Sequence, residues 1–279
     1  MKIYISIDME GMPGTFNWAQ EKKDRRAVQN CIFDHVKTVI EAIRQSPRDN
    51  DITEIVIADS HAAGDNLPYE ITALDERVAL ISGGPRPYYM MPVLSADYDR
   101  VFFLGYHAGT GALHGNMDHT YSSSRIQRIN INGRAMNETL INAAYAGYLG
   151  IPVTLVTGDL ALQQELALSD AMPWVDFVTT KEATAKFAAK NFSQTLVRRQ
   201  TTAAVGMNLA RPRDDFPLYR VTAPITLTIE FRCTSMADMA AIMPGVKRLD
   251  GRTVEYSHAD YAVIFEAIMA LVILAYSSD

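Results

Sequence analysis

Residues 3–11, IYISIDMEG, combine an apolar run with two carboxylates and a glycine at its end. In an extended strand, side chains two residues apart point to the same face, so Asp8 and Glu10 project together from the end of a predicted strand. Two adjacent carboxylates repel each other, and a divalent cation or a group of basic side chains is needed to keep both ionised. No basic residue follows them before Lys22. The pair therefore indicates a metal site.

The bulk composition is that of an ordinary globular protein. The chain has 279 residues, of which 48% are hydrophobic and 21% charged, which is enough for a large core in one domain or in two closely packed ones. Its net charge is −6 and it has no basic stripe, which argues against a nucleic-acid partner. Its most apolar stretch, residues 267–276, is too short to span a bilayer. We expect no membrane partner.

The cysteines and the N-terminus indicate the compartment. Cys31 and Cys233 lie far apart and form no CxxC motif, so a disulfide scaffold is not expected and a reducing compartment fits. The N-terminus lacks the basic-then-apolar pattern of a secretory signal. We predict a cytoplasmic protein.

Apolar strands alternate with helical segments along the chain. We expect strands at residues 2–7, 54–58, 78–81, 101–106 and 152–157. We expect helices at residues 24–45, at residues 137–149 and from Asp159, and a hairpin at residues 126–136 with its turn at Asn132 and Gly133. Continuous apolar strands between helices predict an α/β fold with a mainly parallel sheet flanked by helices.

The character of the chain changes at about residue 190. A helix at 193–205 and a polar link precede a strand at 225–231, a short helix at 235–242, a strand near Val254 and a final helix at 259–275. We predict a metal-binding catalytic region of residues 1–190 and a smaller C-terminal α/β subdomain of residues 191–279 packed on it. One continuous domain is the alternative.

Three predicted strand ends carry side chains that bind metals. Asp8 and Glu10 follow the first strand, His61 follows the second, and His107 follows the VFFLGY strand. The carboxyl ends of parallel strands meet at one edge of the sheet, where ligands bind. Taken singly, Asp8 could cap a turn, His61 could be a turn residue and His107 could be a buried structural histidine. Their equivalent positions in three segments favour a common site.

A glycine-rich segment at residues 108–124 is expected to be a flexible loop near these strand ends. It contains His114 and His119, one of which we expect to be catalytic; their spacing does not choose between a ligand and a proton-transfer role. His35 lies on the early helix and is expected to be structural, and His258 is expected to be a cap or surface group. Glu138 opens a helix and suits its dipole. It becomes a ligand only if that helix end faces the strand tips.

Five short segments occur along the first half of the chain in this order: SIDMEG at 6–11, DSH at 59–61, GYHA at 105–108, NMDH at 116–119 and NE at 137–138. Together they resemble the DppA-type D-aminopeptidases, zinc peptidases associated with dipeptide-transport operons. The stretch IMPG at 242–245 and the closing apolar helix also fit this family. The resemblance therefore covers essentially the whole chain.

The resemblance implies a centre with two zinc ions per subunit. Asp8 would be the carboxylate shared by both ions, and His119 would be the catalytic histidine, with His114 outside the pattern. The remaining protein ligands would be Glu10, His61, His107 and Glu138. The family hydrolyses short peptides with an N-terminal D-residue, such as D-Ala-D-Ala, and forms a decameric ring with its active sites facing an internal channel. The loops at 12–24 and 108–116 look individual in this chain, and they would shape substrate access.

Carboxylates and imidazoles without cysteine suit zinc and also tolerate manganese or cobalt. Metal-activated water with His119 as acid, base or oxyanion stabiliser would give an aminopeptidase. Another dinuclear amidohydrolase or a phosphoesterase is the alternative, for which Arg125 and Arg128 are available. A non-catalytic peptide-binding protein linked to dipeptide transport is the weakest interpretation, because it would need no such set of side chains.

Overall fold

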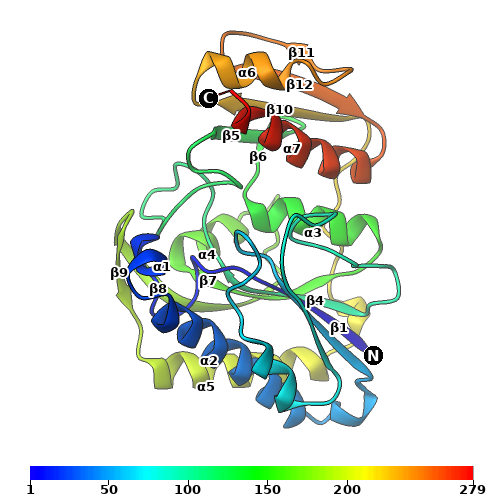
Figure 1. Ribbon diagram of the computed structural model, residues 1–279. Coiled ribbons are helices and arrows are strands. Elements are labelled where there is room, and N and C mark those ends of the chain that lie inside the picture. Colours follow the sequence, from blue (N-terminus) through cyan, green and yellow to red (C-terminus); the bar gives the residue numbers. More distant parts are fainter. Residues whose placement is uncertain (279) are drawn as a thin grey trace.

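A seven-stranded sheet forms the base of the structure, a computed structural model that describes residues 1–278 (Figure 1). Its strands, in spatial order, are β3 (Val78–Ile81), β2 (Glu54–Asp59), β1 (Lys2–Ile7), β4 (Arg100–Tyr106), β7 (Val153–Asp159), β8 (Asp176–Ala185) and β9 (Ala188–Asn191). All neighbouring pairs are parallel except β8 with β9. The predicted α/β fold with a mainly parallel sheet is confirmed.

Helices cover both faces of this sheet. One face is covered by α2 (Arg25–Arg44) and α5 (Gln194–Ala210), which lie side by side in Figure 1. The other face carries α3 (Glu138–Tyr148) and α4 (Leu160–Leu166). A short helix, α1 (Ala19–Lys23), precedes α2. Three 3-10 helices lie in the connections, at Asp49–Asp51, Tyr69–Leu74 and Arg213–Asp215.

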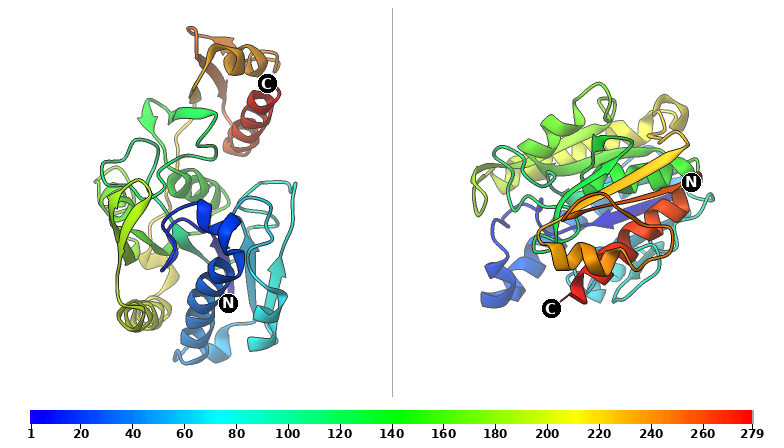
Figure 2. Two further views of the ribbon diagram at one scale, coloured as in Figure 1. Left: turned by 60° about the vertical axis from the view of Figure 1, so that its left-hand side comes forward. Right: turned by 90° about the horizontal axis from the view of Figure 1, so that it is seen from above.

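A second sheet lies at one end of the molecule, beyond α3 (Figure 2). It is antiparallel, and its strands in order are β11 (Lys247–Arg248), β12 (Thr253–His258), β10 (Ile225–Phe231), β5 (Ile126–Ile131) and β6 (Arg134–Ala135). Two helices, α6 (Thr234–Ala240) and α7 (Tyr261–Tyr276), pack on it, and α7 also contacts α3. No helix within residues 1–278 combines the length and the apolar character needed to cross a membrane.

The two sheets draw on segments from both sides of residue 190. Strands β5 and β6 come before it and join the second sheet, whereas α5 comes after it and packs on the first. The proposed division into residues 1–190 and 191–279 therefore stays a prediction. The helix α1, the short strand β11 and the hairpin of β8 and β9 were not predicted from the sequence, while the expected helices and strands are present.

Strand β1 separates the two apolar cores by the alternation of its side chains. Ile3 and Ile5 belong to the core that contains α2, and Tyr4 belongs to the core that contains α3. Ser6 lies on the second face, where its Oγ is 2.8 Å from Ser60 Oγ and 2.7 Å from Tyr106 Oη. These hydrogen bonds join the ends of β1, β2 and β4 directly below the edge where the predicted ligands lie.

His35 makes the stability of the fold depend on pH. It is buried on α2 with its Nε2 2.9 Å from Thr157 Oγ1, and burial lowers its pKa from 6.5 to about 4. The unfolded chain therefore binds a proton in a range where the folded chain does not, so this contribution is complete above pH 6.5 and is lost as the pH falls towards 4. We expect unfolding free energy to fall by about 2 kcal/mol between pH 7 and pH 5 from this group alone.

Denaturant unfolding of wild type and His35→Gln at both pH values measures this contribution. The comparison cancels other groups that titrate in the same range. A pH dependence that is equal in both proteins would contradict it.

Candidate metal centre

The six predicted site residues meet at the carboxyl edge of the seven-stranded sheet. They follow β1, β2 and β4, begin α3, or lie in the loop after β4. A cavity of about 240 Å³ is lined by all of them except His107, which is buried beside the cavity and stacks on the ring of His119. The side chains are Asp8, Glu10, His61, His107, His119 and Glu138.

Three groups of three side chains within this cluster could hold an ion: two contain Asp8, and the third consists of Glu10, His107 and His119. In the first group with Asp8, His61 Nδ1 lies 3.0 Å from Asp8 Oδ1 and 3.1 Å from Glu10 Oε2. In the second group with Asp8, His107 Nε2 lies 3.4 Å from Asp8 Oδ2 and 3.6 Å from Glu138 Oε1. The potential ligand atoms of each group lie within 4.8 Å of one another. Asp8 thus turns one oxygen to each of its two groups, and this arrangement could hold two cations that share its carboxylate.

Unpartnered buried atoms in this cluster point towards cation binding. Asp8 Oδ2, Glu10 Oε2 and His107 Nε2 are buried and have no hydrogen-bond partner within residues 1–278, although such atoms are usually satisfied. His107 Nδ1 donates to the carbonyl of Ala108 at 2.9 Å, so Nε2 is the ring nitrogen that faces the carboxylates and that would bind a cation once deprotonated. Carboxylate oxygens and imidazole nitrogens of this kind suit zinc.

The charges of the cluster shift the ionisation of its members. Burial and the neighbouring Glu10 raise the pKa of Asp8. Burial opposes protonation of His61, but attraction by Glu10 and hydrogen bonds to nearby carboxylates outweigh it and raise the pKa of His61 well above its usual value. The pKa of His107 is raised in the same way, against burial, by Glu138 and Asp8. Metal binding here competes with protons and weakens in acid.

The structure brings His119, and not His114, to the cavity. His119 Nδ1 donates to the carbonyl of Met117 at 2.9 Å, and its Nε2 lies 3.9 Å from Glu10 Oε1 and 3.7 Å from Glu138 Oε1. Its ring is parallel to that of His107, with 4.4 Å between centroids. His114 is exposed and does not line the cavity.

The two remaining histidines lie outside the cavity, as expected. His35 is a buried structural residue, and His258 is exposed at the end of β12. The helix α3 begins at Glu138 with this end towards the strand tips, so the condition for Glu138 to be a ligand is met by the geometry.

Several residues that the sequence analysis missed hold the predicted ones in place. Trp18 Nε1 donates to Glu10 Oε1 at 2.7 Å, and Glu21 Oε1 lies 3.0 Å from His61 Nε2. Lys181 is fully buried and donates to the carbonyl of Glu10 at 2.6 Å, and burial lowers its pKa to about 7. No metal-binding or catalytic motif marks these residues, and Glu21 and Lys181 reach partners that lie 40 and 171 residues away in sequence.

The tip of the β8–β9 hairpin fixes the loop that carries His119. The carbonyl of Lys186 accepts from Met117 N at 2.7 Å and from Asn116 Nδ2 at 3.0 Å. Its Nζ donates to the carbonyl of Asp118 at 2.6 Å and to Asp118 Oδ1 at 2.8 Å. The aromatic and β-branched residues of FVTT, residues 177–180, are the sequence signal that could have revealed this strand.

We therefore expect Lys186→Met to lower kcat. The loss of the Nζ contacts loosens the segment on both sides of Asp118, and misplacement of a reacting group by about 1 Å costs roughly 100-fold, so we expect a decrease of roughly 10- to 100-fold. Metal content should stay unchanged, because none of the five predicted ligands touches Lys186. Lys190→Met on the same hairpin is the matched control, since Lys190 pairs with the partly exposed Glu182 and lies over the ring of Phe192, neither of which belongs to the loop that carries His119. Equal kcat values for wild type and Lys186→Met would refute this role.

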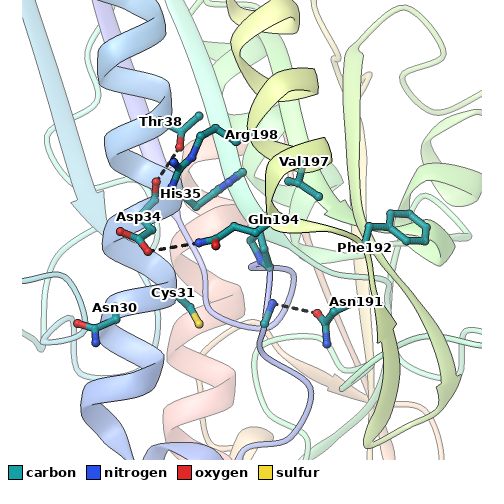
Figure 3. A pocket seen from close by; sticks show the side chains of 12 residues that line it. Asn30, Cys31, Asp34, His35, Thr38, Asn191, Phe192, Gln194, Val197 and Arg198 are labelled. Carbon is teal, nitrogen blue, oxygen red and sulfur yellow. Dashed lines mark hydrogen bonds between the residues drawn. The ribbon is translucent and has the colours of Figure 1, made fainter.

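A separate cavity of about 300 Å³ lies between α2 and α5 and contains none of the six predicted residues (Figure 3). Its polar groups are engaged with one another: Asp34 Oδ2 accepts from Gln194 Nε2 at 3.4 Å, and Asn191 Oδ1 accepts from Gly14 N at 2.9 Å. The cavity at the strand ends is therefore the candidate functional site.

Comparison with known proteins identifies the family. The sequence model of the D-aminopeptidase family, Peptidase M55, matches residues 1–270. The chain belongs to this family. A D-aminopeptidase of Bacillus subtilis (strain 168) is 29% identical over 280 residues, which span 99% of this chain and 98% of the relative. The predicted DppA-type metallo-aminopeptidase is thus confirmed.

A solved structure supports the same assignment. The Zn-dependent D-aminopeptidase DppA from Bacillus subtilis, described as a self-compartmentalizing protease, is similar to this chain with a TM-score of 0.88 and 27% identity. The similarity covers 99% of this chain and 98% of that structure. The M55 fold therefore extends over both sheets.

Proposed function

We propose that this M55 protein is a dinuclear zinc aminopeptidase that hydrolyses short peptides and releases N-terminal D-amino acids. The observation that carries the proposal is the position of Asp8, whose two oxygens face two different groups of metal-binding side chains. The zinc dependence of the similar Bacillus subtilis structure supports the choice of metal. Manganese or cobalt would suit the same donor set.

Asp8 would bridge the two ions in this proposal. Glu10 and His61 would complete one side, and His107 and Glu138 the other. Two zinc ions bound there supply Lewis acidity, which lowers the pKa of water to about 7 and polarises the scissile carbonyl. The free α-amino group of the substrate would be anchored by one of the two ions or by the carboxylate of Glu21 in the cavity lining, as cleavage from the N-terminus requires.

His119 would be the catalytic residue. Its Nδ1 proton is held by the carbonyl of Met117, so Nε2 is the atom that faces the cavity. In the neutral form, Nε2 can take a proton from the attacking water and return it to the leaving amine. In the protonated form, it can donate to the developing oxyanion.

The lining of the cavity argues against a phosphoesterase. Phosphoryl chemistry favours Arg or Lys beside the metal ions, and none of the described residues that line this cavity is either of these. Arg128 lines a different cavity, next to Asn137 and Glu165. A non-catalytic peptide-binding role gives no reason for the cluster.

We further propose a homo-oligomer in the form of a decameric ring in the cytoplasm. The self-compartmentalizing relative of nearly equal length supports an assembly of this kind. Light scattering on the purified protein measures the subunit number.

A substrate panel on the zinc-loaded protein tests the proposed function. We expect two zinc ions per chain and faster hydrolysis of D-Ala-D-Ala than of L-Ala-L-Ala. Assay of p-nitrophenyl phosphate in parallel tests the alternative. Turnover of the phosphate ester without peptide cleavage would refute the aminopeptidase.

A further inference from the structure

A larger cavity of about 580 Å³ opens beside the metal cavity. Four residues line both cavities: Ala62, Tyr89, Tyr121 and Tyr276. One wall of the larger cavity is the loop at residues 84–89, and the other is the helix α7. The two cavities are therefore adjacent and share a boundary made largely of tyrosine rings.

The larger cavity is apolar, in contrast to the metal cavity. Its lining on α7 includes Phe265, Met269 and Ile273. The charged residues among its described lining are Arg86 and Glu266. Two nitrogens of the Arg86 guanidinium are used within the loop, since Nε donates to the carbonyl of Tyr89 and Nη1 to that of Gly83, both at 2.7 Å, while Nη2 is buried and has no hydrogen-bond partner within residues 1–278. The α7 side of the cavity thus suits an apolar group.

The walls of this cavity are held in place by aromatic contacts. Tyr88 stacks on Tyr145 with 5.5 Å between centroids, and Tyr145 stacks on Phe265 at 4.5 Å. Tyr89 meets Tyr121 edge to face at 5.3 Å. Tyr88 and Tyr89 have φ values of 56° and 41°, a conformation that is strained for residues other than glycine and that clusters at ligand sites. The cavity is therefore built before any ligand binds.

We propose that this cavity binds the side chain of the residue that follows the scissile bond, so that the enzyme prefers peptides with an apolar second residue. The inference rests on the proposed function. An aminopeptidase places the first residue at its metals, and the smaller cavity offers space for a small residue such as D-Ala. The remainder of the peptide must leave the metal cavity, and the adjacent apolar cavity is the space beside it that can desolvate an apolar side chain.

The first experiment varies the substrate on the unmodified zinc enzyme. We expect kcat/KM for D-Ala-Leu to exceed that for D-Ala-Gly by roughly 10-fold or more, because a buried leucine side chain contributes a transfer free energy of this size. D-Leu-Ala should gain nothing over D-Ala-Ala. A preference that follows the first residue instead of the second would overturn the proposal.

The second experiment fills the cavity. Ala270 lines it on α7, and Ala270→Phe should lower the ratio of kcat/KM for D-Ala-Leu over D-Ala-Gly to about 1. Ala203→Phe on the exposed side of α5 is the matched control and should keep the wild-type ratio. An unchanged ratio in Ala270→Phe would overturn the proposal.

The mass of each variant in solution tests whether the cavity binds the substrate or contacts a second subunit. If Ala270→Phe changes the oligomeric mass and lowers kcat/KM equally for both dipeptides, the cavity belongs to a subunit contact and the proposal is wrong. Failure of the wild type to hydrolyse any D-Ala dipeptide would instead refute the proposed function.

Discussion

Replacement of Asp8 by alanine is expected to remove both zinc ions and to lower kcat/KM by roughly 1,000-fold or more. Bound metal ions contribute several kcal/mol to the stabilisation of the transition state, and this contribution would be lost. The reason is the shared position of Asp8, which turns Oδ1 towards His61 and Oδ2 towards His107. Loss of any other proposed ligand leaves one of the two Asp8-containing groups intact, whereas loss of Asp8 breaks both and leaves Glu10, His107 and His119 as a group of three. Metal analysis after desalting, together with hydrolysis of D-Ala-D-Ala, measures both effects.

Asp8→Asn provides the conservative comparison, because it keeps the shape of the side chain and removes its charge. We expect it also to lose metal. Asp34→Ala removes a carboxylate on α2 that lines the separate cavity between α2 and α5, and it should keep metal and activity. Two zinc ions per chain in Asp8→Ala would exclude the bridging role.

The convergence of ligands at the strand ends could be predicted because it follows from parallel register. In the structure, Ile7 of β1 is aligned with Asp59 of β2 and Leu104 of β4. A side chain one to three residues beyond each of these positions lies at the same edge. Apolar strands that end in Asp, Glu or His are visible in the sequence, so this part of the site needs no knowledge of the loops.

The choice between His114 and His119 could not be made from the sequence pattern. Both lie in the same glycine-rich loop, and only the path of that loop decides which one reaches the metals. The path depends on Lys186 and on Asp159, which accepts from Asn116 N at 3.0 Å. These contacts join segments tens of residues apart, and the resemblance to a family supplied the assignment instead.

Glu138 shows a similar limit. A carboxylate in the first turn of a helix is favourable wherever the helix lies, so its position in sequence predicts no ligand. Its Oε1 lies 3.6 Å from His107 only because α3 packs with its first turn over the end of β4. The position of Glu138 therefore depends on tertiary contacts. One of them joins the preceding residue, Asn137, to Glu165, whose Oε2 accepts from Asn137 Nδ2 at 2.7 Å.

His119→Ala is expected to lower kcat by about 100- to 10,000-fold, the range that a positioned proton donor or acceptor contributes, while both zinc ions remain bound. The two groups that contain Asp8 are complete without His119, although a ring nitrogen of His119 also lies within 4.8 Å of ligand atoms of Glu10 and His107. This variant should therefore lose activity and keep its metal, whereas Asp8→Ala should lose both. Loss of zinc from His119→Ala would make it a ligand and end the catalytic assignment.

His114→Ala is the matched control, because it removes a histidine from the same loop at an exposed position. We expect it to keep wild-type kcat and metal content. The pH dependence of kcat for wild type and His119→Ala then distinguishes the two roles of the imidazole. If the wild type loses rate in acid and the variant does not, His119 acts as a neutral base. If the wild type loses rate in alkali and the variant does not, His119 acts as a protonated donor to the oxyanion. A profile unchanged in shape would show that His119 positions the substrate without moving a proton.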